Sequence, residues 1–147
     1  MKNAEGDLPP IIAIDPGREK CGLAVVTRDG EVIVREIIPV NDITKRISYY
    51  LGRYGVRNIV LGDRTGSRNI RELIRSAGIS NDVAFVDEDH SSEIARKRWL
   101  IEHPGKGLAR LLPIGMRTPD EPIDDYVAVI LAERYLAGWG STRRRKN

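Results

Sequence analysis

Residues 11–27 read IIAIDPGREKCGLAVVT, two apolar runs that flank a turn beginning at Asp15, Pro16 and Gly17. The runs, Ile11–Asp15 and 21–27, have the length and apolar character of buried strands. A third run, EVIVREII at 31–38, follows an Asp-Gly dipeptide that favours a hairpin turn. Three runs so closely spaced predict an antiparallel meander at the start of the chain.

After residue 40 the pattern changes to helices and strands that alternate. Apolar spacing predicts, in chain order, a helix, a strand, a helix, a strand and two helices: 43–54, 58–62, 70–77, 83–86, 91–101 and 123–136. Residues 104–122 hold four prolines and three glycines and predict a long loop. The order predicts an α/β fold, a mixed five-stranded sheet with helices on both faces.

Length and composition predict one soluble domain. The chain has 147 residues, of which 41% are hydrophobic and 31% charged. A single cysteine excludes an internal disulfide framework and a Cys-rich zinc site. The sequence has no signal peptide and no apolar run of the roughly 20 residues that span a bilayer. We expect a cytoplasmic protein with no membrane contact, a flexible leader at 1–9, a domain at 10–138 and a basic tail at 139–147.

Charge is distributed unevenly along the chain. The net charge is +3, but the tail residues Arg143, Arg144, Arg145 and Lys146 contribute +4, so the rest of the chain carries −1. A second basic stretch, 96–117, holds six Lys and Arg residues against one acid. Separated charge of this kind indicates contact with a polyanion such as nucleic acid. The alternative is a solvated helix face with a solubilising tail.

Carboxylates follow the predicted strands at the points where the strands end, and a pair opens the last helix. They are Asp15, Asp63, Asp87, Glu88, Asp89, Asp124 and Asp125. Strand ends form the usual binding crevice of an open α/β sheet, where converging carboxylates repel one another unless a cation neutralises them. Oxygen ligands suit Mg²⁺ or Mn²⁺. Each acid also has a local explanation, as a turn former or a helix cap, so the pattern as a whole predicts the metal site.

Three motifs occur in order within residues 10–138. They are AIDPGREKCGLAV at 13–25, VDEDHSSEIAR at 86–96 and PIDDYVAVILAERYL at 122–136. The first resembles the opening motif of the RuvC-like and YqgF-type (RuvX) nucleases, in which Asp15, Gly17 and Gly22 are the shared positions. The second resembles the family pattern Asp-Glu-Arg-x-Ser/Thr-x-x-x-Ala, and the third its final helix. The resemblance implies the ribonuclease H-like fold.

The resemblance also implies phosphodiester hydrolysis with two divalent metals. By position, Asp15 would bridge both ions, Glu88 and Asp124 would complete the shell, and Asp125 is placed to assist or substitute. The implied substrate is a Holliday junction or other branched DNA, or a ribosomal RNA precursor. Symmetric junction cleavage implies a homodimer, whereas RNA trimming is compatible with a monomer.

Two departures from the family pattern affect these roles. Asp63 follows the fourth predicted strand, where YqgF-type proteins carry Gly-x-Pro and RuvC-like enzymes carry a catalytic acid. Asp63 is therefore a further candidate catalytic residue and metal ligand. Asp89 and His90 stand where the family has an Arg and an apolar residue, so the resemblance implies the loss of a phosphate contact. His90 would partly replace that contact or act on a proton during turnover, and the alternative is a polar surface group.

Basic residues near the predicted crevice and in the tail are candidates for binding phosphates. They are Arg18, Lys20, Arg64, Arg96, Lys97, Lys106, Arg110, Arg143, Arg144 and Arg145. Such contacts position a nucleic acid without reading its bases. The alternative to a nuclease is a non-catalytic nucleic-acid-binding module of the same fold. A phosphotransferase of the sugar-kinase kind needs a second domain, for which 147 residues leave no room.

Overall fold

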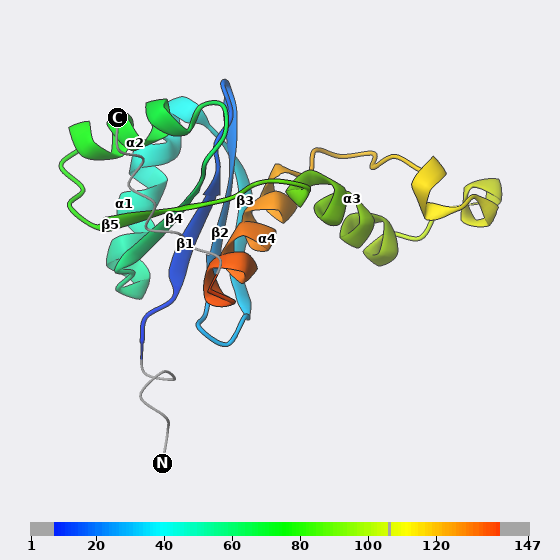
Figure 1. Cartoon of the computed structure of the whole chain (residues 1–147), viewed down its shortest axis with the longest axis horizontal. Helices are drawn as coiled ribbons and strands as arrows, with labels where there is room; N and C mark the ends of the chain where they lie inside the picture. The colour runs from blue at the N-terminus through cyan, green and yellow to red at the C-terminus, as the bar shows by residue number, and fades with distance from the viewer. Residues whose placement is uncertain (1–7, 106, 139–147) are drawn as a thin grey trace, which may run out of the picture.

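A five-stranded mixed sheet forms the centre of the protein, in the order β3-β2-β1-β4-β5 (Figure 1). The computed structural model describes residues 8–105 and 107–138. The strands are β1 Ile11–Asp15, β2 Lys20–Val26, β3 Val32–Pro39, β4 Asn58–Gly62 and β5 Asp82–Val86. β1, β2 and β3 pair antiparallel, whereas β4 and β5 add in parallel on the other side of β1. The predicted meander and mixed sheet are confirmed.

Helices cover both faces of the sheet, as predicted. They are α1 Ile43–Tyr54, α2 Ser67–Ser76, α3 Ser91–Glu102 and α4 Asp124–Leu136, with the short 3₁₀ helices η2 Val40–Asp42, η3 Gly107–Leu111 and η4 Ile114–Met116. α1 and α2 lie on one face and α4 on the other (Figure 1). α3 packs against α4 and, with η3 and η4, extends away from the sheet. The stretch expected to be a plain loop, 104–122, therefore contains two helical turns.

The apolar residues of β1 alternate between two cores. Ile12 and Ile14 pack with the residues of α1 and α2, while Ile11 and Ala13 pack with those of α4. All four side chains are fully buried, because a central strand presents successive side chains to opposite faces of the sheet. Burial on both faces fixes the register of β1, since a shift of one residue would exchange its two sets of side chains.

Small residues let α4 lie close to the sheet. Ala13 pairs with Ala24 across β1 and β2, and both are buried beneath the helix. Gly22 is closer still, because a Cβ atom there would lie 1.8 Å from the backbone oxygen of Asp124. The first residue of α4 therefore rests directly on the backbone of β2. Within the described part of the chain, neither α4 nor any other helix is long and apolar enough to cross a membrane.

Replacement of Gly22 by alanine tests this close approach. We expect Gly22→Ala to lower the free energy of unfolding by about 1–3 kcal/mol, because the new methyl group must push the start of α4 off the sheet. Gly52→Ala is the matched control, because Gly52 lies within α1 and has no atom near the added Cβ. It should raise stability by about 0.5–1 kcal/mol through helix propensity. Urea unfolding measures both, and equal effects would contradict the close contact.

Candidate metal and nucleic-acid site

Carboxylates gather at one edge of the sheet, as the sequence predicts. Asp15 is the last residue of β1, Asp63 follows β4, and Glu88 lies two residues after β5. Because β1, β4 and β5 run parallel, their carboxyl ends meet at the same edge. Asp124 reaches this edge from above β2, where it begins α4. Four of the five predicted catalytic acids thus come from four elements to one region.

Glu88 is buried at the centre of this region. Glu88 is only 6% exposed, and a Cβ atom built on Gly62 would lie 2.0 Å from Oε1 of Glu88. β4 therefore ends in a glycine because the Glu88 carboxyl group occupies the space of a side chain. Oε2 accepts a hydrogen bond of 3.1 Å from the backbone N–H of Arg64. With the acids ionised, the buried Oε1 has no hydrogen-bond donor.

The half-buried Asp15 and the buried Glu88 form an acid pair. Burial raises the pKa of Asp15 to about 8, and a hydrogen bond to Glu88 and the charges of Glu88 and Asp124 act in the same direction. Burial also raises the pKa of Glu88, which the hydrogen bond from Asp15 partly offsets. Without a cation the pair favours a proton on Asp15, because two adjacent carboxylates in a low-dielectric site repel each other.

Of the two acids that open α4, Asp124 faces the acid pair. Its negative charge contributes to the raised pKa of Asp15, and its Oδ2 lies 3.7 Å from Nζ of Lys20. Asp125 is directed to β3 instead, where its Oδ2 accepts a 3.0 Å hydrogen bond from Nε of Arg35. Of these two acids, Asp124 is therefore the better candidate metal ligand, because Asp125 is paired with Arg35.

Asp63 supports the backbone of Glu88. Its Oδ1 accepts a hydrogen bond of 3.3 Å from the N–H of Glu88, and its charge contributes to the raised pKa of Glu88. The Asp63 side chain is otherwise exposed. Asp63 therefore lies beside the acid pair and orders the turn after β5, which is compatible with a positioning role as well as a ligand role.

The acids are not arranged as a complete set of metal ligands. Among residues 8–105 and 107–138, no three Asp, Glu, His or Cys side chains converge closely enough to hold an ion between them. The expected four-ligand set of Asp15, Glu88, Asp124 and Asp63 is therefore not preassembled. Two local contacts account for this, because Asp124 turns toward Lys20 and Asp63 toward the Glu88 amide.

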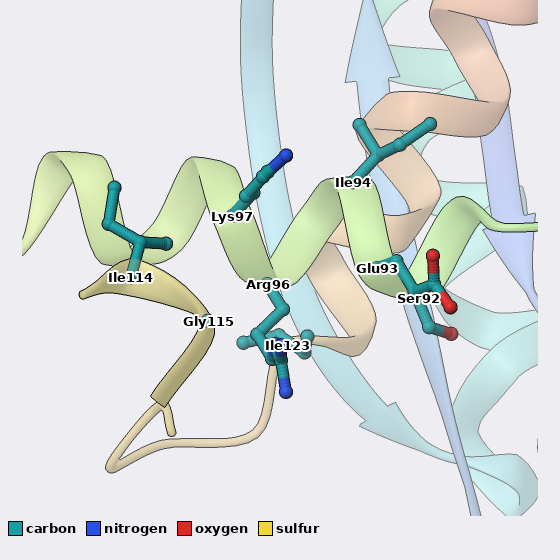
Figure 2. Close-up of a pocket in the computed structure, with 8 residues that line it drawn as sticks. All are labelled: Ser92, Glu93, Ile94, Arg96, Lys97, Ile114, Gly115 and Ile123. Atoms are coloured by element: carbon teal, nitrogen blue, oxygen red, sulfur yellow. The ribbon is translucent and has the colours of Figure 1, made fainter. Parts of the chain in front are cut away.

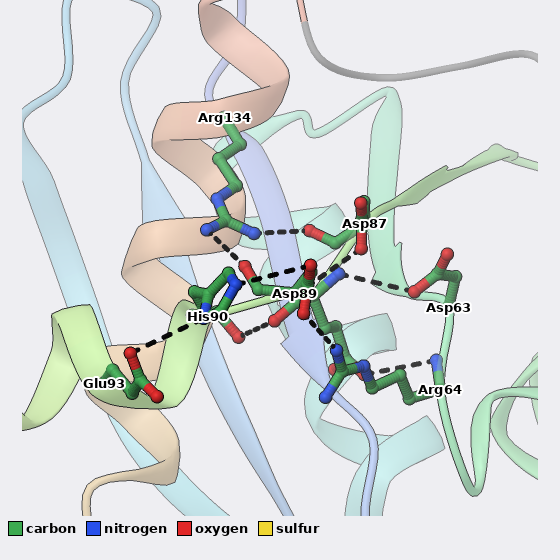
Figure 3. A network of polar contacts seen from close by, with 9 residues as sticks. Asp63, Arg64, Asp87, Asp89, His90, Glu93 and Arg134 are labelled. Carbon is green, nitrogen blue, oxygen red and sulfur yellow. Dashed lines mark hydrogen bonds and ion pairs between the residues drawn. The ribbon is translucent and has the colours of Figure 1, made fainter.

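Arg134, which the sequence analysis did not single out, holds the Glu88 turn in place (Figure 3). Its guanidinium donates to the carbonyl oxygens of Asp87 and Asp89, each at 2.7 Å, so it binds the backbone on both sides of Glu88. Arg134 lies on α4 and is only 8% exposed. The sequence does contain an indication of this role. Arg134 stands in an otherwise apolar helix, and a buried cation needs hydrogen-bond partners.

Two solved structures share the architecture of this chain. Two structures of Thermus thermophilus RuvC match this chain over 88% of its length and 94% of theirs at 16% identity, one in complex with a Holliday junction substrate at a TM-score of 0.56 and one alone at 0.54. The fold is RuvC-like. No protein-family model matches the sequence, and no curated protein matches it. The expected ribonuclease H-like architecture is thus confirmed.

Basic residues border the acid edge of this RuvC-like fold on two sides. Lys20 pairs with Asp124, and the Arg64 guanidinium pairs with Asp89 at 2.9 Å. On α3, Arg96 and Lys97 line a hollow against η4 (Figure 2). The remaining predicted phosphate contacts divide into two groups: Arg18 and Arg110 are exposed, and Lys106, Arg143, Arg144 and Arg145 lie outside the described residues.

The buried proton of Asp15 predicts a dependence of stability on pH. In EDTA, the free energy of unfolding should fall as the pH rises between the usual Asp range, near 3.8, and about 8, because the folded protein keeps a proton that the unfolded chain releases. The slope should be at most about 1.4 kcal/mol per pH unit. Asp15→Asn should make this slope shallower, leaving the part that the raised pKa of Glu88 contributes, and should be more stable than wild type at pH 8. The exposed Asp120→Asn is the control, and a slope as steep in Asp15→Asn as in wild type would contradict the raised pKa of Asp15.

Arg134 predicts a linked change in stability and titration. Arg134→Met should lower the free energy of unfolding by about 1–3 kcal/mol per carbonyl left without a donor, and it should shift the Asp15 pKa because Glu88 is displaced. Carboxyl NMR titration in EDTA measures the pKa. Arg98→Met, which breaks the ion pair with Glu133, should leave the Asp15 titration unchanged. A stability loss in Arg134→Met without a pKa change would contradict the positioning role.

Proposed function

We propose that this protein is a metal-dependent nuclease that hydrolyses phosphodiester bonds in structured nucleic acid, with Holliday junctions and other branched DNA as the principal substrates. The observation that carries the proposal is the acid pair of Asp15 and Glu88, with Asp124 facing it, at the parallel-strand edge of a RuvC-like sheet. The structural neighbour in complex with a Holliday junction substrate supports branched DNA as the first substrate to test.

The donor set fits a divalent cation. Oε1 of Glu88 is buried and has no hydrogen-bond donor when Asp15 is ionised, and burial together with the neighbouring acids raises the pKa of Asp15. A hard cation prefers such oxygen ligands, and its positive charge would favour the ionised form of both carboxyl groups. Asp15, Glu88 and Asp124 would hold it, with Asp63 beside them. Bound Mg²⁺ or Mn²⁺ would supply an activated water and stabilise charge on the phosphate and the leaving oxygen.

The chain's own residues would position the substrate around these acids. Arg64 and Lys20 lie at the rim and carry the positive charge that phosphate oxygens require. Both are paired with carboxylates in the structure, so phosphate binding would exchange one anionic partner for another. Arg96 and Lys97 extend the positive surface along α3. Cleavage of a symmetric junction would require a homodimer, which would present two such sites, whereas cleavage of RNA is compatible with a monomer, and sedimentation separates these two states.

A non-catalytic nucleic-acid-binding module is the second candidate. It is favoured by the absence of a preassembled metal group among the described residues and by the pairing of Asp124 with Lys20. This candidate predicts salt-sensitive binding that does not depend on Asp15, because phosphate contacts dominate such affinity.

Cleavage assays separate the two candidates. Labelled four-way junctions, linear duplexes and structured RNA are incubated with the protein and Mg²⁺ or Mn²⁺. We expect the junction to be cut, and both Asp15→Asn and Glu88→Gln to reduce the rate by about 10²–10³-fold, as loss of a transition-state charge partner does. Asp120→Asn should cut like wild type. Cleavage of RNA alone would assign an RNA substrate, and tight binding without cleavage of any substrate would support the binding module.

A further inference from the structure

A hollow of about 500 Å³ lies between α3 and η4, beside the proposed nuclease site (Figure 2). The hollow is open to solvent, so a group bound there would keep part of its surface exposed. Several residues that line the hollow are close in sequence to residues of the proposed nuclease site. Ser92 and Glu93 begin α3 just after the Glu88 turn, and Ile123 immediately precedes Asp124. The lining of the hollow therefore reaches the residue that precedes Asp124.

The lining of the hollow combines apolar and cationic side chains. Ile94, Ile114 and Ile123 supply apolar surface from α3, from η4 and from the residue before α4. Arg96 and Lys97 supply two positive charges from α3. Glu93 supplies one negative charge at the rim, where its Oε2 lies 3.5 Å from Nδ1 of His90, and its carboxylate can accept hydrogen bonds from amino groups but repels phosphate (Figure 3). The hollow thus suits a molecule with a flat apolar body, N–H donors and a separate anionic group.

We propose that this hollow binds one unpaired nucleotide next to the cleaved phosphate. The base would lie between the isoleucines, with Glu93 accepting from its N–H groups, and its phosphate would lie at Arg96 and Lys97. Extruded bases are held between apolar or aromatic side chains in this way, and extrusion costs least where the base is already unpaired. The inference deepens the proposed function, on which it rests, because it names the substrate class: nucleic acid with an unpaired nucleotide at the cleavage point.

An apolar-to-acidic substitution in the hollow tests this assignment. Variants are made in the Asp15→Asn background, so that binding is measured without cleavage. The probes are a DNA duplex with one bulged 2-aminopurine and the same duplex with the 2-aminopurine paired. We expect the parent protein to bind the bulged duplex about tenfold more tightly and to change the fluorescence of the bulged base. Ile114→Glu should abolish this preference and the fluorescence change, and should leave the affinity for the paired duplex within about twofold.

Leu108→Glu is the matched control, because Leu108 is 83% exposed in η3 of the same extension and does not line the hollow. It adds the same charge and should keep the preference. Equal affinity of the parent for both duplexes, a preference that survives Ile114→Glu, or an equal loss in Leu108→Glu would overturn the inference.

The two proposals fail separately in these experiments. A bulge preference with the expected Ile114→Glu effect, in a wild-type protein that cuts nothing, would support the nucleotide site and contradict the nuclease. Cleavage of junctions by a protein without bulge preference would support the nuclease and overturn the nucleotide site. Failure to bind any nucleic acid would overturn both.

Discussion

The desolvation and mutual repulsion of the carboxyl groups of Asp15 and Glu88 are the constraint on which the site depends. The sheet forces this contact, because β1 and β5 are both paired in parallel with β4 and end at the same edge. Gly62, at the end of β4, leaves room for the Glu88 carboxyl group, and the Arg64 amide binds its outer oxygen. Only a proton or a cation makes the pair electrostatically acceptable. The fold therefore stabilises an arrangement whose unfavourable charge is suited to a metal ligand set.

α4 joins both halves of this arrangement. Its first residue, Asp124, rests on Gly22 of β2, and Arg134, ten residues later, binds the backbone around Glu88. Ten residues of helix span about 15 Å, so one rigid element fixes acids that come from distant parts of the sequence. The apolar burial of the helix between these two residues supplies the stability that holds the charged groups in place.

The sequence was sufficient for the fold and for the gathering of the acids, because apolar periodicity and strand ends are local signals. It was insufficient where the outcome depends on contacts between distant backbone atoms. The choice between Asp124 and Asp125 depends on how α4 is rotated over β2 and β3, and the role of Arg134 depends on two carbonyl groups more than forty residues away. The hollow could not be predicted, because it forms where η4 packs against α3. Residues 104–122 lack the periodicity that would indicate this packing.

The glycines beneath the site have a consequence for genetics. At Gly22 and Gly62 a single methyl group would enter space occupied by the Asp124 backbone and the Glu88 side chain, respectively. Alleles that alter no carboxylate would therefore disturb the same group of acids as a substitution of one of the carboxylates. In a random-mutagenesis selection for loss of function, inactivating alleles should cluster at these two codons as well as at those of the acids, and they should be scarce at the codon for Gly52, which has open space around its Cβ position.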